Sequence, residues 1–378
     1  MQCWFKGDNG GWWNTEQLSI FRRIYRLSLF FVWTVQWLTS SIKCFFGVYL
    51  DAYHIYAVHG IPPDTPTWVH VYDVAFFAVN NDTVFLPKSI YGKWSVGSEV
   101  VITPHTSVWD ATQVRTITSI STFFAPNSNY VTVRFNESIV RPTTVVESPD
   151  FAVEVALLSR NILLDSSLED ADQGGHLMIS YTPNVVQTID GMEMRNFGQQ
   201  GNIGRYPIHF HYCNNVAGSI VSKNTIRQSS QRCIVVHGTN QLKVVNNVAF
   251  DTKGHCFMTE DGSETGNEFL YNLGTQVGKP NKLITNEGPN GNETDHEPSI
   301  YWITNPTNTF IGNVAAGSEH SGFWFEPKLR GIRTNLYPNY NPMFEPLTLF
   351  KDNVAHSCNA GRLVSVLNMR DLIMHVPD

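Results

Sequence analysis

Charged residues are scarce in this chain, and the basic excess of a nucleic-acid-binding protein is absent. Lysine and arginine total 26, aspartate and glutamate total 33, and the formal net charge is −7. This balance argues against a general nucleic-acid ligand, which needs a basic field. A polyanionic ligand would need a local patch of Arg and His. The 16% of charged residues accompany 42% of hydrophobic residues, which is typical of a folded chain.

Cysteine is also infrequent, with six residues in 378. That number is too small for a disulfide scaffold. Cys233 and Cys256 hold equivalent positions in the repeat described below, so we expect neighbouring core residues with Cα atoms ~4.8 Å apart. This distance permits a bridge, but parallel Cβ vectors favour two free core thiols.

The N-terminal apolar stretch, residues 27–38, is too short for a standard membrane span of ~20 residues. It follows three arginines, and a weaker apolar stretch covers residues 42–50. Its length is that of a signal peptide, and the preceding basic residues predict a signal anchor with a cytosolic N-terminus. A single-pass anchor within residues 1–50 is therefore one interpretation, and a buried or amphipathic helix is the alternative.

Residues 51–150 alternate apolar and polar side chains in short runs that Pro, Gly and Asn separate. This pattern predicts a small β-rich domain. Three N-x-S/T sequons, at Asn81, Asn136 and Asn292, are compatible with a glycoprotein.

One register returns four times in the second half of the chain. Each unit begins at an asparagine and ends on a short alternating run thirteen residues later: Asn224 to His237, Asn247 to Glu260, Asn313 to Glu326 and Asn353 to Val366. Units of about 23 residues are typical of a solenoid, which we predict for residues 151–378. The asparagines are expected at tight corners, where stacked side chains can bond one another. Residues 278–298 interrupt the pattern and are expected to form a loop.

Several longer motifs follow one another in an order that resembles a known family. They are Gly-Arg-Tyr-Pro-Ile-His-Phe-His at 204–211, Arg-Cys-Ile-Val-Val-His-Gly at 232–238, Gly-His-Cys-Phe-Met-Thr-Glu-Asp-Gly at 254–262, Gly-Ser-Glu at 317–319 and Gly-Phe-Trp at 322–324. With residues 94–102 and 155–162, they are similar to the family of the cell migration-inducing and hyaluronan-binding protein and transmembrane protein 2. Fibrocystin-like proteins are more distantly similar.

This resemblance implies a right-handed parallel β-helix after a small glycine-named ("G-eight") domain. It also implies action on hyaluronan, which some members depolymerise and others bind, and a location either at the cell surface as a type II membrane protein or outside the cell. Residues 1–50 do not match the family, and its helix continues beyond residue 378. We therefore expect both domains to be incomplete at their outer ends.

The register places ionisable side chains in one column. His209 and His211 lie two residues apart on one strand and so share a face. His237 and then Glu260 follow at steps of ~4.8 Å. Glycoside hydrolysis needs two carboxyl groups at the bond, so we assign Glu260 as the acid and Asp261 as its partner or electrostatic helper. Asp261 is expected to face away unless a turn begins there, which Gly262 favours.

Further side chains suit a uronate-bearing glycan. Arginine makes bidentate contacts with carboxylates, and aromatic rings can stack on sugars. The expected substrate-binding residues are Arg232, Arg205, His255, Tyr206 and Trp324. Glu326 shares the register position of Glu260 and ranks below it.

Other chemistries remain open for the same column. His209, His211 and His237 are candidate ligands of a divalent transition metal, because a His-x-His pair with a stacked His and Glu offers suitable donors. A lyase, in which Arg neutralises the uronate and a His or Tyr takes the C5 proton, is another. The column can also be a solvated ladder, and His255 a structural residue. The main hypothesis is a hyaluronan-degrading glycoside hydrolase, and the alternative is a non-catalytic surface protein that binds hyaluronan or a related glycosaminoglycan.

Overall fold

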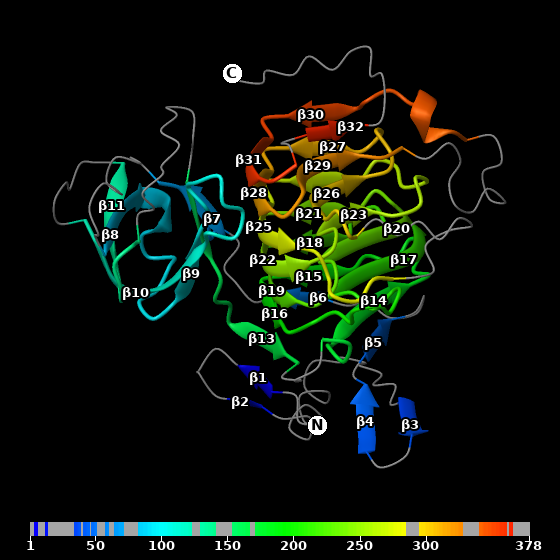
Figure 1. Ribbon diagram of the computed structural model, residues 1–378, viewed down its shortest axis with the longest axis horizontal. Coiled ribbons are helices and arrows are strands. Elements are labelled where there is room, and N and C mark those ends of the chain that lie inside the picture. Colours follow the sequence, from blue (N-terminus) through cyan, green and yellow to red (C-terminus); the bar gives the residue numbers. More distant parts are fainter. Residues whose placement is uncertain are drawn as a thin grey trace.

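The computed structural model describes residues 64–71, 82–122, 129–140, 153–166, 171–284, 295–327 and 340–360 in full, and elsewhere the backbone of a few short strands. This part of the chain is all-β, as predicted: apart from two single-turn 3-10 helices, η2 (Lys88–Ile90) and η3 (Pro342–Phe344), its regular elements are strands. Figure 1 shows a tall stack of coils with a smaller β domain at its side.

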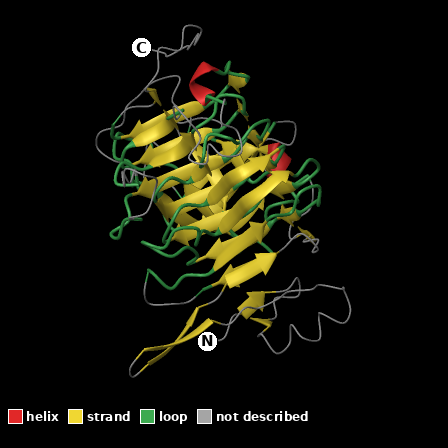
Figure 2. Cartoon of the chain, turned by 90° about the vertical axis from the view of Figure 1, so that its right-hand side faces the viewer, coloured by secondary structure: helices red, strands yellow, loops and turns green. Residues whose placement is uncertain are grey.

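Three parallel sheets form the stack, and successive coils add a strand to each (Figures 1 and 2). Sheet 1 contains β13 (Ile162–Asp165), β16 (Met192–Arg195), β19 (Thr225–Ser229), β22 (Val248–Lys253), β25 (Leu273–Gly278), β28 (Val314–Ser318) and β31 (Val354–Cys358). Sheet 2 contains β14 (His176–Ser180), β17 (Ile208–Asn215), β20 (Ile234–Asn240), β23 (Phe257–Thr259), β26 (Ser299–Ile303), β29 (Ser321–Phe325) and β32 (Leu363–Ser365). Sheet 3 contains β15 (Thr188–Asp190), β18 (Ile220–Ser222), β21 (Lys243–Val245), β24 (Glu268–Leu270), β27 (Thr309–Ile311) and β30 (Leu349–Lys351). The expected parallel β-helix is therefore confirmed.

Apolar side chains from all three sheets fill the interior of the coils. Rings repeat in register along sheet 2: Tyr301 stacks between Phe257 and Phe323 at centroid distances of 4.9 and 4.6 Å. Burial of each such side chain contributes roughly 1.5–3 kcal/mol, so the stacked core stabilises every coil against its neighbours.

Asparagines stack at the corner between sheets 3 and 1, as the repeat predicts. The Nδ2 groups of four asparagines donate to the Oδ1 of the next one at 2.9 or 3.0 Å, in the order Asn224, Asn247, Asn272, Asn313 and Asn353. The left-handed backbone lies on the residue before the asparagine, as at Lys223 (φ 52°) and Tyr271 (φ 54°). The asparagine therefore satisfies buried backbone groups, while its predecessor turns the corner.

The N-terminal strands extend the solenoid. β5 (Gly47–Leu50) pairs in parallel with β14, and β6 (Ala57–His59) pairs with β15. β1 (Trp4–Lys6) is antiparallel both to β13 and to β2 (Trp12–Trp13). The solenoid therefore takes strands from ranges expected to form the N-terminal segment and the small domain.

Most of the stretch expected as a signal anchor lies outside the described residues. Its last five residues form β3 (Thr34–Leu38), a strand that pairs antiparallel with β4 (Ser41–Phe45). Among the residues that the structure describes, no helix has the length and apolar character of a membrane span.

The smaller domain is a six-stranded antiparallel sheet. Its spatial order is β7 (Trp68–His70), β12 (Glu154–Leu157), β9 (Glu99–Ile102), β10 (Gln113–Ser121), β11 (Tyr130–Phe135) and β8 (Thr83–Pro87). Every second residue of β8 is buried, as the alternating sequence predicts. Because β12 lies inside this sheet, the domain extends past the boundary expected at residue 150.

This domain packs on the outer face of sheet 1. From the smaller domain, Val101, Ala156 and Leu158 contact a buried apolar patch on sheet 1. The residues of this patch are Val248, Phe250, Leu273, Val314 and Ala316. Charged pairs flank the patch. Arg227 lies 2.7 Å from Glu99, and His356 Nε2 lies 3.1 Å from Glu154 Oε2.

Cys233 and Cys256 form a disulfide, so the expectation of free thiols is wrong. Their Cα atoms are 4.5 Å apart and both side chains lie in the core, as predicted. Both residues precede their strands, and Arg232 next to Cys233 has a left-handed backbone (φ 47°). The parallel Cβ vectors of a regular ladder therefore do not apply at this corner.

Candidate active site

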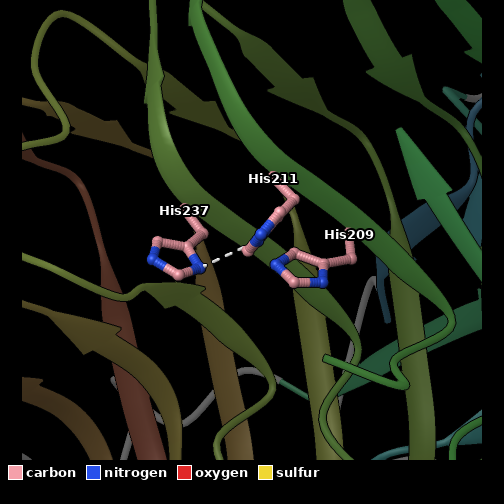
Figure 3. A group of neighbouring side chains, drawn as sticks. All are labelled: His209, His211 and His237. Carbon is pink, nitrogen blue, oxygen red and sulfur yellow. Dashed lines mark hydrogen bonds between the residues drawn. The ribbon is translucent and has the colours of Figure 1, made fainter. Parts of the chain in front are cut away.

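Strands β17 and β20 place three histidines on the outer face of sheet 2. Ile208 and Phe210 of β17 point into the core, so the alternating His209 and His211 point outward. His211 is paired with His237 across the two strands. The three rings face one another in Figure 3, and one ring nitrogen of each lies within 4.8 Å of the others. The column predicted from the register is thus present in space.

Two histidines are joined directly. His211 Nδ1 and His237 Nδ1 share a hydrogen bond of 3.2 Å, and the His209 and His237 rings are near-parallel with centroids 5.8 Å apart. His209 Nδ1 donates to the carbonyl of Gly204 at 3.0 Å. This bond leaves Nε2 of His209 directed at the next coil.

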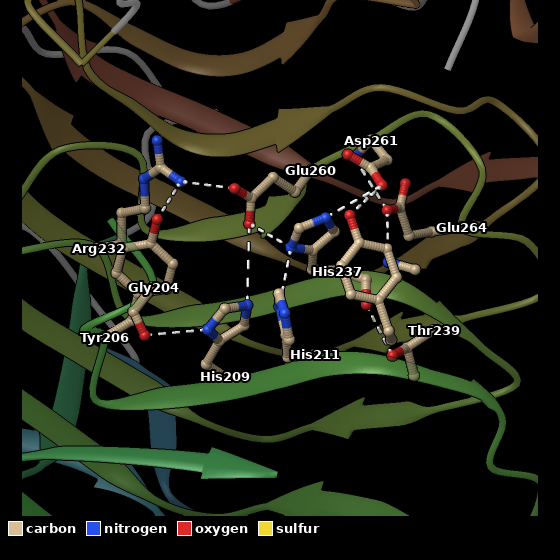
Figure 4. A network of polar contacts seen from close by, with 12 residues as sticks. Gly204, Tyr206, His209, His211, Arg232, His237, Thr239, Glu260, Asp261 and Glu264 are labelled. Carbon is tan, nitrogen blue, oxygen red and sulfur yellow. Dashed lines mark hydrogen bonds and ion pairs between the residues drawn. The ribbon is translucent and has the colours of Figure 1, made fainter. Parts of the chain in front are cut away.

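Glu260 directly follows β23, the next strand of sheet 2, and lies above these rings in Figure 4. Its Oε2 is 3.3 Å from His237 Nδ1 and 3.9 Å from His209 Nε2. Its Oε1 is 3.6 Å from Arg232. The Glu260 amide continues the ladder by donating to the carbonyl of Val236 at 3.1 Å. Figure 4 shows the carboxylate between the guanidinium and the imidazoles.

A turn brings Asp261 to the same face. Gly262 has φ 85°, and the Glu264 carboxylate accepts hydrogen bonds from the amides of Asp261, Gly262 and Gly238 at 2.8–2.9 Å. Asp261 Oδ2 then lies 3.0 Å from His237 Nε2 and accepts a bond from the Tyr212 hydroxyl at 3.2 Å. The turn expected at Gly262 therefore decides the direction of Asp261.

Two histidines of the cluster have pKa values that are shifted in opposite directions. Burial opposes the charged form of His237, but Glu260 and Asp261 outweigh it and raise the His237 pKa to about 9. Burial, with the neighbouring His237 and His211, holds the pKa of His209 well below its usual range. His237 is therefore favoured as an imidazolium and His209 as a neutral ring at pH 7.

Arg232 lies beside the cluster, at the level of Glu260, and is completely buried (Figure 4). Its NH1 donates to the Tyr206 hydroxyl at 2.9 Å, and its Nε lies 3.3 Å from Asp295 Oδ2. Burial lowers the Arg232 pKa, but the Asp295 and Glu260 carboxylates outweigh it and raise that pKa. The buried amide and ring of His255 face Asp295 Oδ1 at 3.0 and 3.7 Å. Burial raises the Asp295 pKa, but Arg232 and His255 outweigh it and lower that pKa.

The remaining predicted substrate-binding residues lie at different distances from the cluster. Tyr206 contacts it through Arg232 and through its ring, 4.9 Å from that of His209. Arg205 is half-buried and bonds His176 at 2.6 Å. Trp324 lies further along the outer face of sheet 2, on β29, where its Nε1 donates to Glu326 at 3.0 Å. The structure therefore groups Tyr206 and Arg232 with the catalytic candidates, and places Trp324 several coils away.

Sequence reasoning missed three residues of the network. Glu264 holds the Asp261 turn, Asp295 pairs with Arg232, and Tyr212 bonds Asp261. A signal existed for Glu264, since an acidic residue shortly after an Asp-Gly pair can accept the amides of the turn. Asp295 belongs to the insertion at 278–298, and the repeat does not predict the conformation of an insertion.

With this geometry, the chain is a parallel β-helix protein that carries a buried polar column on one outer face. A family model described as CEMIP beta-helix matches residues 172–362, about half of the chain. The chain belongs to this family, as the sequence motifs predict.

Curated relatives support the same assignment. The cell surface hyaluronidase CEMIP2 of Homo sapiens is 32% identical over 252 residues, covering 56% of this chain and 18% of the relative. A cell surface hyaluronidase of Danio rerio is 28% identical over 333 residues, or 77% of this chain and 24% of the relative. A G8 domain-containing protein of Dictyostelium discoideum is 32% identical over 293 residues, or 73% and 19%. The chain thus spans about a fifth of the length of these relatives.

Proposed function

We propose that this chain binds hyaluronan or a related uronate-bearing glycosaminoglycan on the outer face of sheet 2 and hydrolyses its glycosidic bonds. Two relatives carry the name cell surface hyaluronidase, which supports this substrate class and a location at the cell surface or outside the cell. The outer face offers carboxyl, imidazole and guanidinium groups within one cluster.

The observation that carries the proposal is the position of Glu260 and Asp261 at opposite edges of one imidazole. Glu260 Oε2 is 3.3 Å from Nδ1 of His237, and Asp261 Oδ2 is 3.0 Å from Nε2. The imidazole therefore lies between the two carboxyl groups, and inverting glycosidases likewise hold their two carboxyl groups apart, at ~6.5–9.5 Å. In such enzymes that separation leaves room for a water molecule beside the bond.

The roles follow from the surroundings of each carboxyl group. Glu260 Oε2 lies 3.3 Å from Nδ1 of the His237 imidazolium and passes a proton from that ring to the glycosidic oxygen. Asp261 is the second carboxyl group, and Tyr212 and His237 orient it. Arg205, half-buried and next to Tyr206 in the chain, is the candidate for meeting the uronate carboxylates.

A polymer-shortening assay tests this function. High-molecular-weight hyaluronan is incubated with the chain and analysed by size exclusion. The wild type is expected to shorten the polymer, and Glu260→Gln to be at least ~100-fold slower, because proton transfer is worth ~10²–10⁴-fold. Glu268→Gln, the same chemical change at a surface pair with Lys243, is expected to keep full activity. An inactive wild type, or an active Glu260→Gln, contradicts hydrolysis at this site.

One observation favours binding without cleavage as the second candidate. Glu260 and Asp261 are only 6% and 4% exposed, so a sugar ring must displace neighbouring side chains to reach them. In that case the chain retains hyaluronan in a pull-down, Glu260→Gln changes only the affinity, and the polymer stays intact.

A further inference from the structure

We propose that His209, His211 and His237 bind a divalent transition metal of the zinc class, with Glu260 beside its open fourth position. This site deepens the proposed function, on which it rests, and is built from the same side chains. The three imidazoles come from two adjacent strands and converge on the outer face of sheet 2 (Figure 3).

The separations of the donor atoms fit a four-coordinate ion. At bond lengths of ~2.0–2.1 Å, the corners of a zinc tetrahedron lie about 3.3–3.4 Å apart. His211 Nδ1 and His237 Nδ1 are 3.2 Å apart, and His237 Nδ1 and Glu260 Oε2 are 3.3 Å apart. His209 Nε2 lies 3.9 Å from Glu260 Oε2. Small rotations of the side chains therefore suffice to place the three imidazole nitrogens around one ion, with Glu260 Oε2 beside the fourth position.

Two buried atoms in the cluster lack a hydrogen-bond partner among the described residues. His209 Nε2 and Glu260 Oε2 make no hydrogen bond within the described part of the chain, although these residues are only 1% and 6% exposed. Because the Nδ1 proton of His209 goes to the Gly204 carbonyl, its Nε2 presents a lone pair. Facing this lone pair with a carboxylate oxygen is unfavourable unless a cation or a proton lies between them.

The surrounding bonds are those that ligating histidines require. A metal-bound imidazole normally donates its other N–H to a carbonyl or a carboxylate, which fixes the tautomer and the ring. His209 uses the carbonyl of Gly204 at 3.0 Å. His237 has the Asp261 carboxylate 3.0 Å from Nε2, which stabilises the tautomer with its proton there and frees Nδ1 for the ion. Gly204 and Asp261 therefore act as positioning groups.

The donor set also indicates the class of metal. Imidazole nitrogens suit zinc, copper, iron and nickel, whereas calcium and magnesium prefer oxygen ligands. Three histidines with one position open are the ligands of a catalytic zinc site. An oxygen of the glycan, such as a uronate carboxylate, would complete the shell next to Glu260.

Calorimetric titration of the chelator-treated chain with Zn²⁺, in the absence of glycan, tests the site. We expect one equivalent to bind, and His211→Gln and His237→Gln to weaken binding by more than ~100-fold. Asp261→Asn is expected to cost ~10–100-fold, because it removes only the group that orients His237. The control is His70→Gln, in the smaller domain, which keeps the wild-type affinity.

A second measurement, the visible absorption spectrum, identifies the ligands. Co²⁺ in place of Zn²⁺ is expected to give the intense visible bands of a four-coordinate ion, and His211→Gln to abolish them. His211 is partly exposed, so this variant tests the site even where His237→Gln fails to fold. Wild-type affinity in His211→Gln, or no stoichiometric binding by the wild type, overturns the proposal. Since neither measurement contains hyaluronan, an inactive hydrolase and an absent metal are distinguishable.

Discussion

The outer faces of sheets 1 and 2 belong to the same coils but pack against different groups. On sheet 1, Val248, Phe250 and Leu273 form a dry patch beneath the smaller domain. On sheet 2, His209, His237 and Glu260 lie next to a smaller apolar group that contains Val235, Met258 and Trp302. The interior residues of both sheets join one apolar cluster. The repeat therefore specifies the inside of the solenoid, while the outward residues decide what each face contacts.

The two faces also differ in how much charged groups contribute to the free energy of unfolding. On sheet 1, charged pairs lie around an apolar contact, so burial of apolar surface carries the stability. On sheet 2, several ionisable groups are buried together, and each depends on its partners. Removing one group should therefore cost most on sheet 2.

The largest effect is expected from Arg232→Met. This change removes the guanidinium that faces Asp295 and Glu260 but keeps much of the apolar bulk of the side chain. Two buried carboxylates lose their partner, and we expect a loss of about 3–5 kcal/mol in the free energy of unfolding. Urea denaturation followed by circular dichroism measures it.

The control for this prediction is Arg134→Met. Arg134 makes a comparable pair with Asp82, but on the surface of the smaller domain. Surface pairs contribute little, so its unfolding midpoint should stay near that of the wild type. Equal midpoints for the two variants would show that the buried network does not stabilise sheet 2.

The fold was predictable because its signals are local and repeated. The spacing from Asn224 to His237 and from Asn247 to Glu260 gives the coil length, and the alternating strands give the inward face. The coil that begins at Asn272 escaped the register, because the insertion after β25 delays its sheet 2 strand until Ser299. The disulfide was not predicted from the register either, because its formation depends on the backbone conformation at the corner before β20.

A smaller effect is expected from Phe250→Ala, on the face that the smaller domain covers. The ring is 8% exposed within the contact between the domains. Its removal leaves a cavity and should cost about 3 kcal/mol, at the lower end for a phenylalanine. Limited proteolysis is the second measurement, because a loosened contact exposes the smaller domain to cleavage before the solenoid. Unchanged stability and proteolysis would mean that the patch does not hold the domains together.

The candidate site was only partly predictable. His237 and Glu260 follow from the register, because equivalent positions stack on neighbouring coils, and His209 and His211 share a face by alternation along one strand. The partners of the column come from turns and loops: Glu264 fixes a turn, and Asp295 arrives from an insertion. Side-chain direction at such points depends on backbone that has no period, so the repeat carries no information about it.

The smallest effect, and the most specific for sheet 1, is the pH dependence due to Glu154. Burial opposes the ionised form of this carboxyl group, but His356 and Thr103 outweigh it and lower the Glu154 pKa. The folded state then binds fewer protons than the unfolded state. The stability from this pair is complete above the unfolded pKa, near 4.5, and is lost as the pH falls through the lower folded value.

Glu154→Gln isolates this contribution. The amide keeps the shape of the side chain but cannot ionise, so the variant should be less stable than the wild type at about pH 7. As the pH falls below about 4.5, the difference should shrink, because the wild type loses its ionised carboxylate. Urea midpoints of both proteins at several pH values measure this convergence. A constant difference across the range would mean that the charge of Glu154 does not stabilise the contact with His356, and that shape alone joins the smaller domain to the last coils.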